Sequence, residues 1–155
     1  MANQRSEISM SAEEVAVFLA EPHIATMCTV NWDGSIHAVA MWYGFYDGKL
    51  AMQTKAKSQK ARNVIRDPRM TCLVAAGERY EELRGVELVG RAALLDDPAQ
   101  LFAVGVSVFD RYVAPYTDEA RGAVETMLRK RVAFVLNVER TVSWDHRKLA
   151  MAEPG

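Results

Sequence analysis

The sequence predicts a mainly β protein with helices (α+β), in which an antiparallel barrel carries helices at one end. Two dipeptides, Asp33-Gly34 and Asp47-Gly48, separate strand-like segments, and such pairs favour tight hairpin turns. Strands and helices do not alternate regularly along the chain, so the sequence lacks the pattern of a parallel sheet. No repeat or linker divides the 155 residues, and we expect one domain over residues 1–155.

The first part of the chain predicts a helix followed by a three-stranded meander. Ser11 and Glu14 have the spacing of a capping box, and an apolar helix face follows them until Pro22. After that helix the period changes to that of strands. We expect these strands over 23–31, 35–46 and 49–54.

The second part predicts a short helix over 58–66, with Ser58 as its N-cap and Asp67-Pro68 as its end. Strands over 70–76 and 86–95 follow, and Gly90 predicts a bulge or bend in the latter. Two helical stretches, near 98–110 and 118–131, form an insert over about 98–131. Strands over 132–138 and 143–149 close the chain.

The overall charge argues against a nucleic-acid protein. The chain has 19 Lys and Arg against 20 Asp and Glu, a formal net charge of -1. Its two cysteines are too few for a disulfide scaffold, and no apolar run has the length that spans a bilayer. The polar N-terminal segment lacks the apolar centre of a signal peptide. We therefore expect a cytoplasmic protein that binds neither nucleic acid nor membrane.

The segment 55–69 contains six basic residues and a single acid, Asp67. Lys60 falls in the first turn of the helix that Ser58 caps, and Asn63 follows one turn later. Free amides and the helix dipole attract anions there, whereas cations without an anion oppose the dipole. The residues alone leave two interpretations open: an anion site, or a solvated basic helix face.

Aromatic residues crowd the end of the strand expected over 35–46. Strand alternation would place Met41 and Tyr43 on one face and Trp42 on the other. These side chains either stack on a planar ligand or pack in the core. On the strand expected over 143–149, Trp144, His146 and Lys148 share a face. This face either reaches a cofactor or a partner subunit, or it protects an exposed sheet edge by its charge. The three histidines lack the spacing of a zinc site, so no metal is expected.

Several segments together resemble a known family. They are His23 to Gly34, Tyr43 to Thr54, the Lys57-Ser-Gln-Lys-Ala-Arg-Asn-Val-Ile-Arg-Asp-Pro-Arg69 element, Gly85 to Ala92, and Arg140 to Lys148. The chain is similar to the pyridoxamine 5'-phosphate oxidase-like split β-barrel flavoproteins, and most to their branch that uses the deazaflavin coenzyme F420. The resemblance implies a homodimer with cofactor sites at the subunit interface.

The resemblance also implies which residues bind the cofactor. They are Met41, Trp42, Thr54, Lys55, Lys57, Ser58, Lys60 and Asn63, with Trp144 and Lys148 as candidates from the partner subunit. Tyr43 and His146 are weak candidates for a proton donor. The expected activity is hydride transfer from reduced F420 to a small conjugated organic substrate. Two alternatives stay open: an FMN-dependent oxidase or reductase of the same fold, and a flavin-, F420- or haem-binding protein without catalytic activity.

Overall fold

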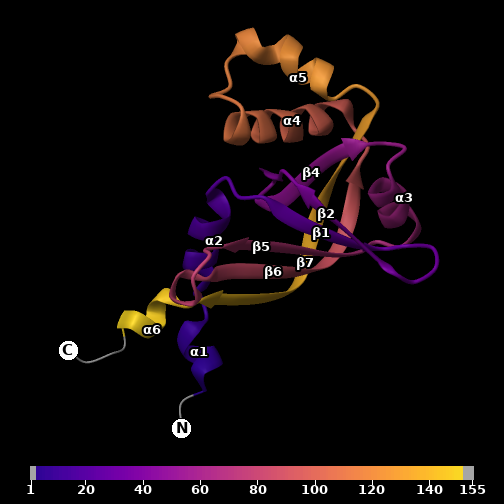
Figure 1. Ribbon diagram of the computed structural model, residues 1–155. Coiled ribbons are helices and arrows are strands. Elements are labelled where there is room, and N and C mark those ends of the chain that lie inside the picture. The colour runs from indigo at the N-terminus through magenta and orange to yellow at the C-terminus, as the bar shows by residue number, and fades with distance from the viewer. Residues whose placement is uncertain (1–2, 152–155) are drawn as a thin grey trace.

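The computed structural model describes residues 3–151, and its centre is one seven-stranded sheet that curls into a half-barrel (Figure 1). All paired strands are antiparallel, which confirms the predicted antiparallel split barrel. The strand order is β2-β1-β5-β6-β7-β4-β3. The expected domain of residues 1–155 includes 1–2 and 152–155, which lie outside the described residues. The strands are β1 (Ala25–Val30), β2 (Ile36–Met41), β3 (Gly44–Tyr46), β4 (Lys49–Lys55), β5 (Arg69–Ala76), β6 (Arg84–Leu95) and β7 (Arg131–Asp145).

The chain crosses from one edge of the sheet to the other between β2 and β3. The single strand predicted over 35–46 is wrong, because β2 ends at Met41 and β3 begins at Gly44. β2 pairs with β1 at one edge, whereas β3 pairs with β4 at the opposite edge. Trp42 and Tyr43 make this crossing. The next turn, at Asp47 and Gly48, has positive φ at both residues (52° and 73°), as a tight hairpin requires.

The two longest strands, β6 and β7, pair along most of their length. Their register shifts between Val89 and Gly90, which confirms the predicted irregularity at this glycine. A Cβ at Gly90 would collide with the carbonyl oxygen of Asn137. Two closing strands were predicted, but β7 is one strand between β4 and β6: it pairs with β4 from Arg131 to Val135 and with β6 from Ala133 to Asp145.

The helices are α1 (Gln4–Ile8), α2 (Ala12–Ala20), α3 (Gln59–Arg66), α4 (Pro98–Tyr112), α5 (Arg121–Met127) and α6 (Arg147–Met151), with 3-10 turns at Tyr80–Glu82 and Asp118–Ala120. The capping box of Ser11 and Glu14 is present as predicted. The insert helix expected over 118–131 is shorter, because a 3-10 turn precedes α5 and β7 already begins at Arg131. The helices α1 and α6 were not predicted.

The main core lies between α2 and the sheet, where Phe18, Met27, Tyr43 and Phe134 are buried. A smaller cluster lies under α4 and joins Val104 and Val108 to β4 and β7. Figure 1 shows α4 and α5 at one end of the half-barrel and α1 and α6 at the other. Among residues 3–151, no helix is both long and apolar enough to cross a bilayer.

Candidate functional site

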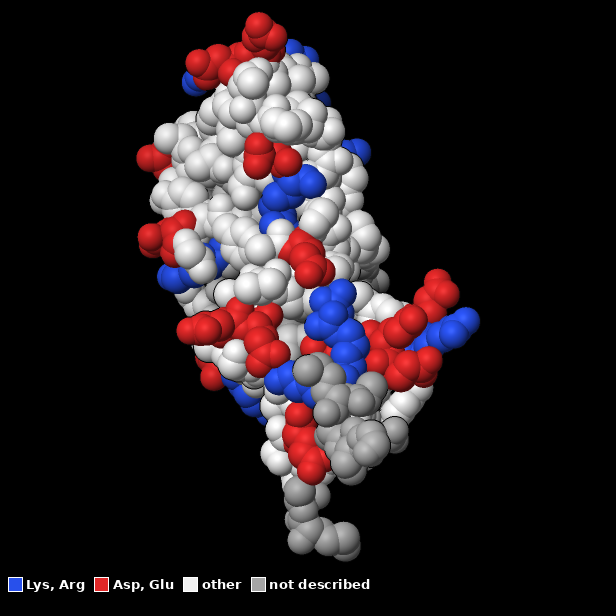
Figure 2. Space-filling model, turned by 90° about the vertical axis from the view of Figure 1, so that its left-hand side faces the viewer, with Lys and Arg blue, Asp and Glu red and all other residues white. Residues whose placement is uncertain are grey.

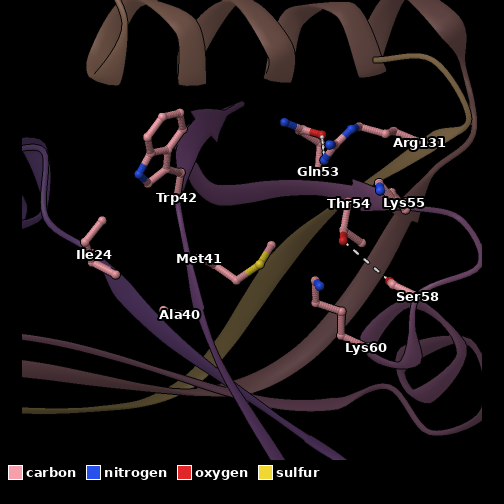
Figure 3. A pocket seen from close by; sticks show the side chains of 10 residues that line it. All are labelled: Ile24, Ala40, Met41, Trp42, Gln53, Thr54, Lys55, Ser58, Lys60 and Arg131. Atoms are coloured by element: carbon pink, nitrogen blue, oxygen red, sulfur yellow. Dashed lines mark hydrogen bonds between the residues drawn. The ribbon is translucent and has the colours of Figure 1, made fainter. Parts of the chain in front are cut away.

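A pocket of about 550 Å³ opens between the end of β2, the end of β4 and the start of α3 (Figure 3). Ten residues line it, and they come from five parts of the chain. They are Ile24, Ala40, Met41, Trp42, Gln53, Thr54, Lys55, Ser58, Lys60 and Arg131. Six of them were predicted as cofactor-binding residues: Met41, Trp42, Thr54, Lys55, Ser58 and Lys60. The structure therefore brings together two segments that the sequence indicated separately.

The connection from β4 to α3 forms the polar end of the pocket. Ser58 caps α3, and its hydroxyl accepts a hydrogen bond from the amide of Ala61 (3.3 Å). The hydroxyl oxygen of Thr54 lies 3.4 Å from that of Ser58. Two hydroxyls and the first turn of α3 therefore face the pocket at one point, next to the Lys60 side chain (Figure 3).

Three cations line this end: Lys55, Lys60 and Arg131. None of the described residues that line the pocket is acidic. Lys55 and Arg131 are neighbours across the β4–β7 pair, and the Arg131 guanidinium donates to the side-chain oxygen of Gln53 (3.1 Å). Burial lowers the pKa of Lys60, and the charges of Arg131 and Lys55 lower it further. Cations held together in this way repel one another, and an anion between them relieves the repulsion.

Lys57 and Asn63 lie outside the pocket lining. Lys57 is exposed in the turn before α3. Asn63 is fully buried, and its amide nitrogen donates to the Thr29 hydroxyl (3.0 Å) and to the Asn31 side-chain oxygen (2.9 Å). In the structure the Asn63 amide connects α3 to the β1–β2 hairpin and does not line the pocket, so the predicted contact of Asn63 with a cofactor stays a prediction.

The apolar end of the pocket consists of Trp42, Met41 and Ile24. Trp42 is 45% exposed, and its indole lies face to face with the Tyr112 ring, with 4.8 Å between ring centroids and 2° between planes. Tyr43 points the other way into the core, where its hydroxyl donates to the Leu19 carbonyl (2.7 Å). Burial raises the pKa of Tyr43 to about 12. Tyr43 therefore does not line the pocket, and its role as a proton donor stays a prediction.

The C-terminal candidates do not share a strand face, because β7 ends at Asp145 and α6 begins at Arg147. The Asp145 carboxylate accepts hydrogen bonds from the amide and the guanidinium of Arg147, and these bonds turn the chain into the helix. The ring of Trp144 lies over Gly85, where it leaves no room for a Cβ. Nδ1 of His146 hydrogen-bonds to the Tyr80 carbonyl (2.8 Å).

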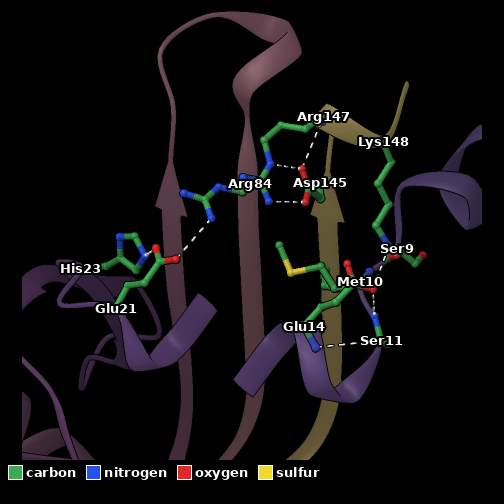
Figure 4. Close-up of polar contacts among 11 residues, drawn as sticks. Ser9, Met10, Ser11, Glu14, Glu21, His23, Arg84, Asp145, Arg147 and Lys148 are labelled. Atoms are coloured by element: carbon green, nitrogen blue, oxygen red, sulfur yellow. Dashed lines mark hydrogen bonds and ion pairs between the residues drawn. The ribbon is translucent and has the colours of Figure 1, made fainter. Parts of the chain in front are cut away.

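Lys148 is held within its own chain. Its ammonium donates to the Ser9 carbonyl (2.7 Å) and to the Glu14 carboxylate (2.9 Å), as Figure 4 shows. On this side of the molecule, basic and acidic side chains lie next to one another over the lower half (Figure 2). The pocket lining of the same chain thus does not include Trp144, His146 or Lys148. Whether they reach a partner's pocket stays a prediction.

The pocket lining also includes four residues that the sequence did not predict: Ile24, Ala40, Gln53 and Arg131. Arg131 lies next to Lys55 only because β7 pairs with β4, and that pairing joins distant parts of the chain. Among the described residues, no group of three or more His, Cys, Asp and Glu side chains could hold a metal ion.

Comparison with known proteins gives one family and two relatives named for the same cofactor. The family model described as Pyridoxamine 5'-phosphate oxidase matches residues 11–145. An F420H(2)-dependent biliverdin reductase of Mycobacterium tuberculosis is 28% identical over 133 residues, which are 84% of this chain and 90% of that protein. A solved F420 reductase has a TM-score of 0.61 at 27% identity, over 81% of this chain and 93% of the other.

A further solved structure is much more similar, although its name gives no activity. It is a conserved hypothetical protein of Mycobacterium tuberculosis, with a TM-score of 0.92 and 45% identity. The match covers 99% of this chain and 96% of that one. The fold described above is therefore shared over nearly the whole length of both chains.

Proposed function

Because the chain belongs to the pyridoxamine 5'-phosphate oxidase family, we propose that it is an F420H2-dependent reductase. It would transfer a hydride from the reduced deazaflavin to a small conjugated organic substrate. The biliverdin reductase and the F420 reductase, both named for this cofactor, support F420 over other flavin-like groups.

The observation that carries the proposal is the two-ended character of the pocket. A half-exposed indole and the Met41 side chain border one end, and three cations without an acid border the other. This arrangement suits a ligand with a flat ring and an anionic side chain, because the ring gains contact area where the anion gains charge complementarity. F420 has both parts, and so has FMN.

The chain's own residues would bind and orient this ligand. Lys55, Lys60 and Arg131 would hold the anionic side chain, together with the hydroxyls of Thr54 and Ser58. Trp42 and Met41 would border the ring, so that its reactive side has a fixed direction. Reduced F420, when bound, supplies the hydride, and the protein supplies position and charge.

We further propose a homodimer that borders the pocket. One face of the β1–β2 pair carries mostly small, uncharged side chains: Ile36, which is 63% exposed, Ala38 and Ala40 from β2, beside Cys28 and Thr26 from β1. Exposed apolar side chains that lie together on a sheet face favour burial against another protein. Ala40 also lines the pocket, so a second copy on this face would lie next to the cofactor.

Parallel fluorescence titrations of the purified protein with F420 and with FMN test the proposal. Tight binding of F420 followed by reduction of a conjugated acceptor with F420H2 is the expected result. Tight binding of FMN alone would replace the proposal by a flavin enzyme of the same fold. Tight F420 binding without turnover of any acceptor would indicate a carrier. Binding of neither ligand would overturn both the F420 proposal and the FMN alternative.

A further inference from the structure

The Trp42 indole is fixed by a residue from a distant helix. Tyr112 is the last residue of α4, and its ring covers one face of the indole at a centroid separation of 4.8 Å. The indole is otherwise 45% exposed at the apolar end of the pocket (Figure 3). One face of Trp42 is thus occupied within the protein, while the residue still contributes open surface to the pocket.

Tyr112 is itself held at its hydroxyl and at its ring. The hydroxyl donates to the His23 carbonyl (2.6 Å) and accepts a hydrogen bond from the Tyr43 amide (3.3 Å). The Arg111 guanidinium lies 5.5 Å from the centre of the Tyr112 ring. These contacts tie the end of α4 to the segment before β1 and to the crossing between β2 and β3.

Arg111 connects the end of α4 to the backbone of two other segments. Its guanidinium donates to the carbonyl of Tyr43 (2.8 Å) and to that of Ala20 (3.0 Å), and it lies over the Tyr43 ring at 4.5 Å. The Tyr112 ring that stacks on Trp42 is therefore held in place by several independent hydrogen bonds and ring contacts. A tryptophan in a connection between strands would otherwise lose side-chain entropy when a ligand orders it.

We infer that Tyr112 is a positioning residue: it holds the Trp42 indole so that the open side of the indole can receive the planar ring of the ligand. The identity of that ring as F420 rests on the function proposed above. Helix α4 of the insert would thereby control how firmly the ring is held, although α4 contributes no residue to the pocket lining.

Two variants of Tyr112 and one matched control test this role. Tyr112→Leu removes the stack, and Tyr112→Phe keeps it. Tyr116→Leu removes a tyrosine of the same insert whose ring contacts Phe102 and Phe109 and not Trp42. The Kd is measured for each variant in the otherwise unchanged protein. Trp42 emission is measured in the Trp32→Phe/Trp144→Phe background, in which Trp42 is the single tryptophan.

In Tyr112→Leu we expect the Kd for F420 to rise about three- to tenfold, as loss of one aromatic pair predicts. We also expect Trp42 emission to shift to longer wavelength and to be quenched more strongly by acrylamide, because loss of the Tyr112 ring exposes more of the indole to solvent. Tyr112→Phe and Tyr116→Leu should both keep the Kd within about twofold of the parent, because each leaves the stack in place. Melting temperatures of all variants separate these effects from a general loss of stability.

The outcomes distinguish this inference from the proposed function. If the parent binds F420 and Tyr112→Leu binds it equally well, or leaves Trp42 emission unchanged, the positioning role is overturned. An equal loss in Tyr116→Leu would overturn it as well. If the parent binds FMN and not F420, the proposed cofactor is wrong, and titration of the same variants with FMN then tests the positioning role of Tyr112. If the parent binds neither F420 nor FMN, both the positioning role and the proposed function are overturned.

Discussion

Lys60 and Lys57 are basic residues of the same short segment with different surroundings. Lys60 lines the pocket beside Lys55 and Arg131, whereas Lys57 is exposed in the preceding turn. We expect Lys60→Ala to raise the Kd for F420 about ten- to hundredfold, because it removes a charge-assisted contact. Lys57→Ala should change the Kd by about twofold or less, as an exposed charge does. Titration at two salt concentrations checks this, and equal losses in both variants would contradict a defined anion site.

Asp145 connects protonation to stability. It is 5% exposed, and the Arg147 guanidinium that it pairs with lowers the pKa of its carboxyl. A carboxyl whose pKa is lower in the folded than in the unfolded state stabilises the fold above its unfolded pKa. That contribution is lost as the pH falls through the folded pKa.

At pH 7 we therefore expect Asp145→Asn to lower the free energy of unfolding by about 1 kcal/mol, a modest value because Arg147 is half exposed. The difference between wild type and variant should shrink below about pH 4. Urea unfolding at pH 7, 5 and 3 measures it. A difference that stays constant over this range would show that the charge of Asp145 is irrelevant.

Among the elements, the β6–β7 pair depends on a glycine at its register shift. A Cβ at Gly90 would meet the backbone of Asn137, and backbone cannot move aside cheaply. We expect Gly90→Ala to lower the free energy of unfolding by about 1–3 kcal/mol, the usual cost of overpacking. Urea denaturation followed by circular dichroism provides the measurement.

Gly122 in α5 provides the matched control, because a Cβ there meets nothing within 4 Å. Gly122→Ala should be neutral or should stabilise the protein by about 0.5–1 kcal/mol, since alanine is the better helix residue. If both alanine variants destabilised the protein equally, the register shift at Gly90 would not be the cause.

The elements that the sequence predicted correctly are those set by local chemistry. The capping box at Ser11, the hairpin at Asp47-Gly48 and the helix between Ser58 and Asp67 all follow from neighbouring residues. The break at Trp42 could not be predicted, because the residues around it continue a strand pattern. The break arises because β2 pairs with β1 at one edge of the sheet, whereas β3 pairs with β4 at the opposite edge.

The same distinction holds for the candidate site. The hydroxyls and lysines around Ser58 were predicted because they lie close together in sequence. Arg131 was missed because it joins them only through the β4–β7 pair. The family resemblance places Asn63 at the ligand, and Asn63 follows Lys60 by one helical turn. A buried amide must satisfy its hydrogen bonds, however, and the partners that it finds are on the β1–β2 hairpin.

For the whole molecule, the apolar face of β1 and β2 and the pocket lie next to each other. Ala38 stands on this face opposite Cys28, and Ala40 belongs to both the face and the pocket lining. If a second copy covers the face, then dimerisation and cofactor binding are coupled, because the partner would border the bound ring. A change on the face, made outside the pocket lining, should weaken both.

We expect Ala38→Asp to raise the dimer dissociation constant by at least about a hundredfold, because it places an unpaired carboxylate in an apolar interface. Sedimentation velocity over a range of protein concentrations measures this, and the Kd for F420 should rise in parallel. Val17→Asp is the control: Val17 is a 66% exposed apolar residue of α2, away from the β1–β2 face. It should stay dimeric with an unchanged Kd. An Ala38→Asp protein that is still dimeric would place the subunit contact elsewhere. A monomer that binds F420 as tightly as wild type would show that each pocket is complete within one chain.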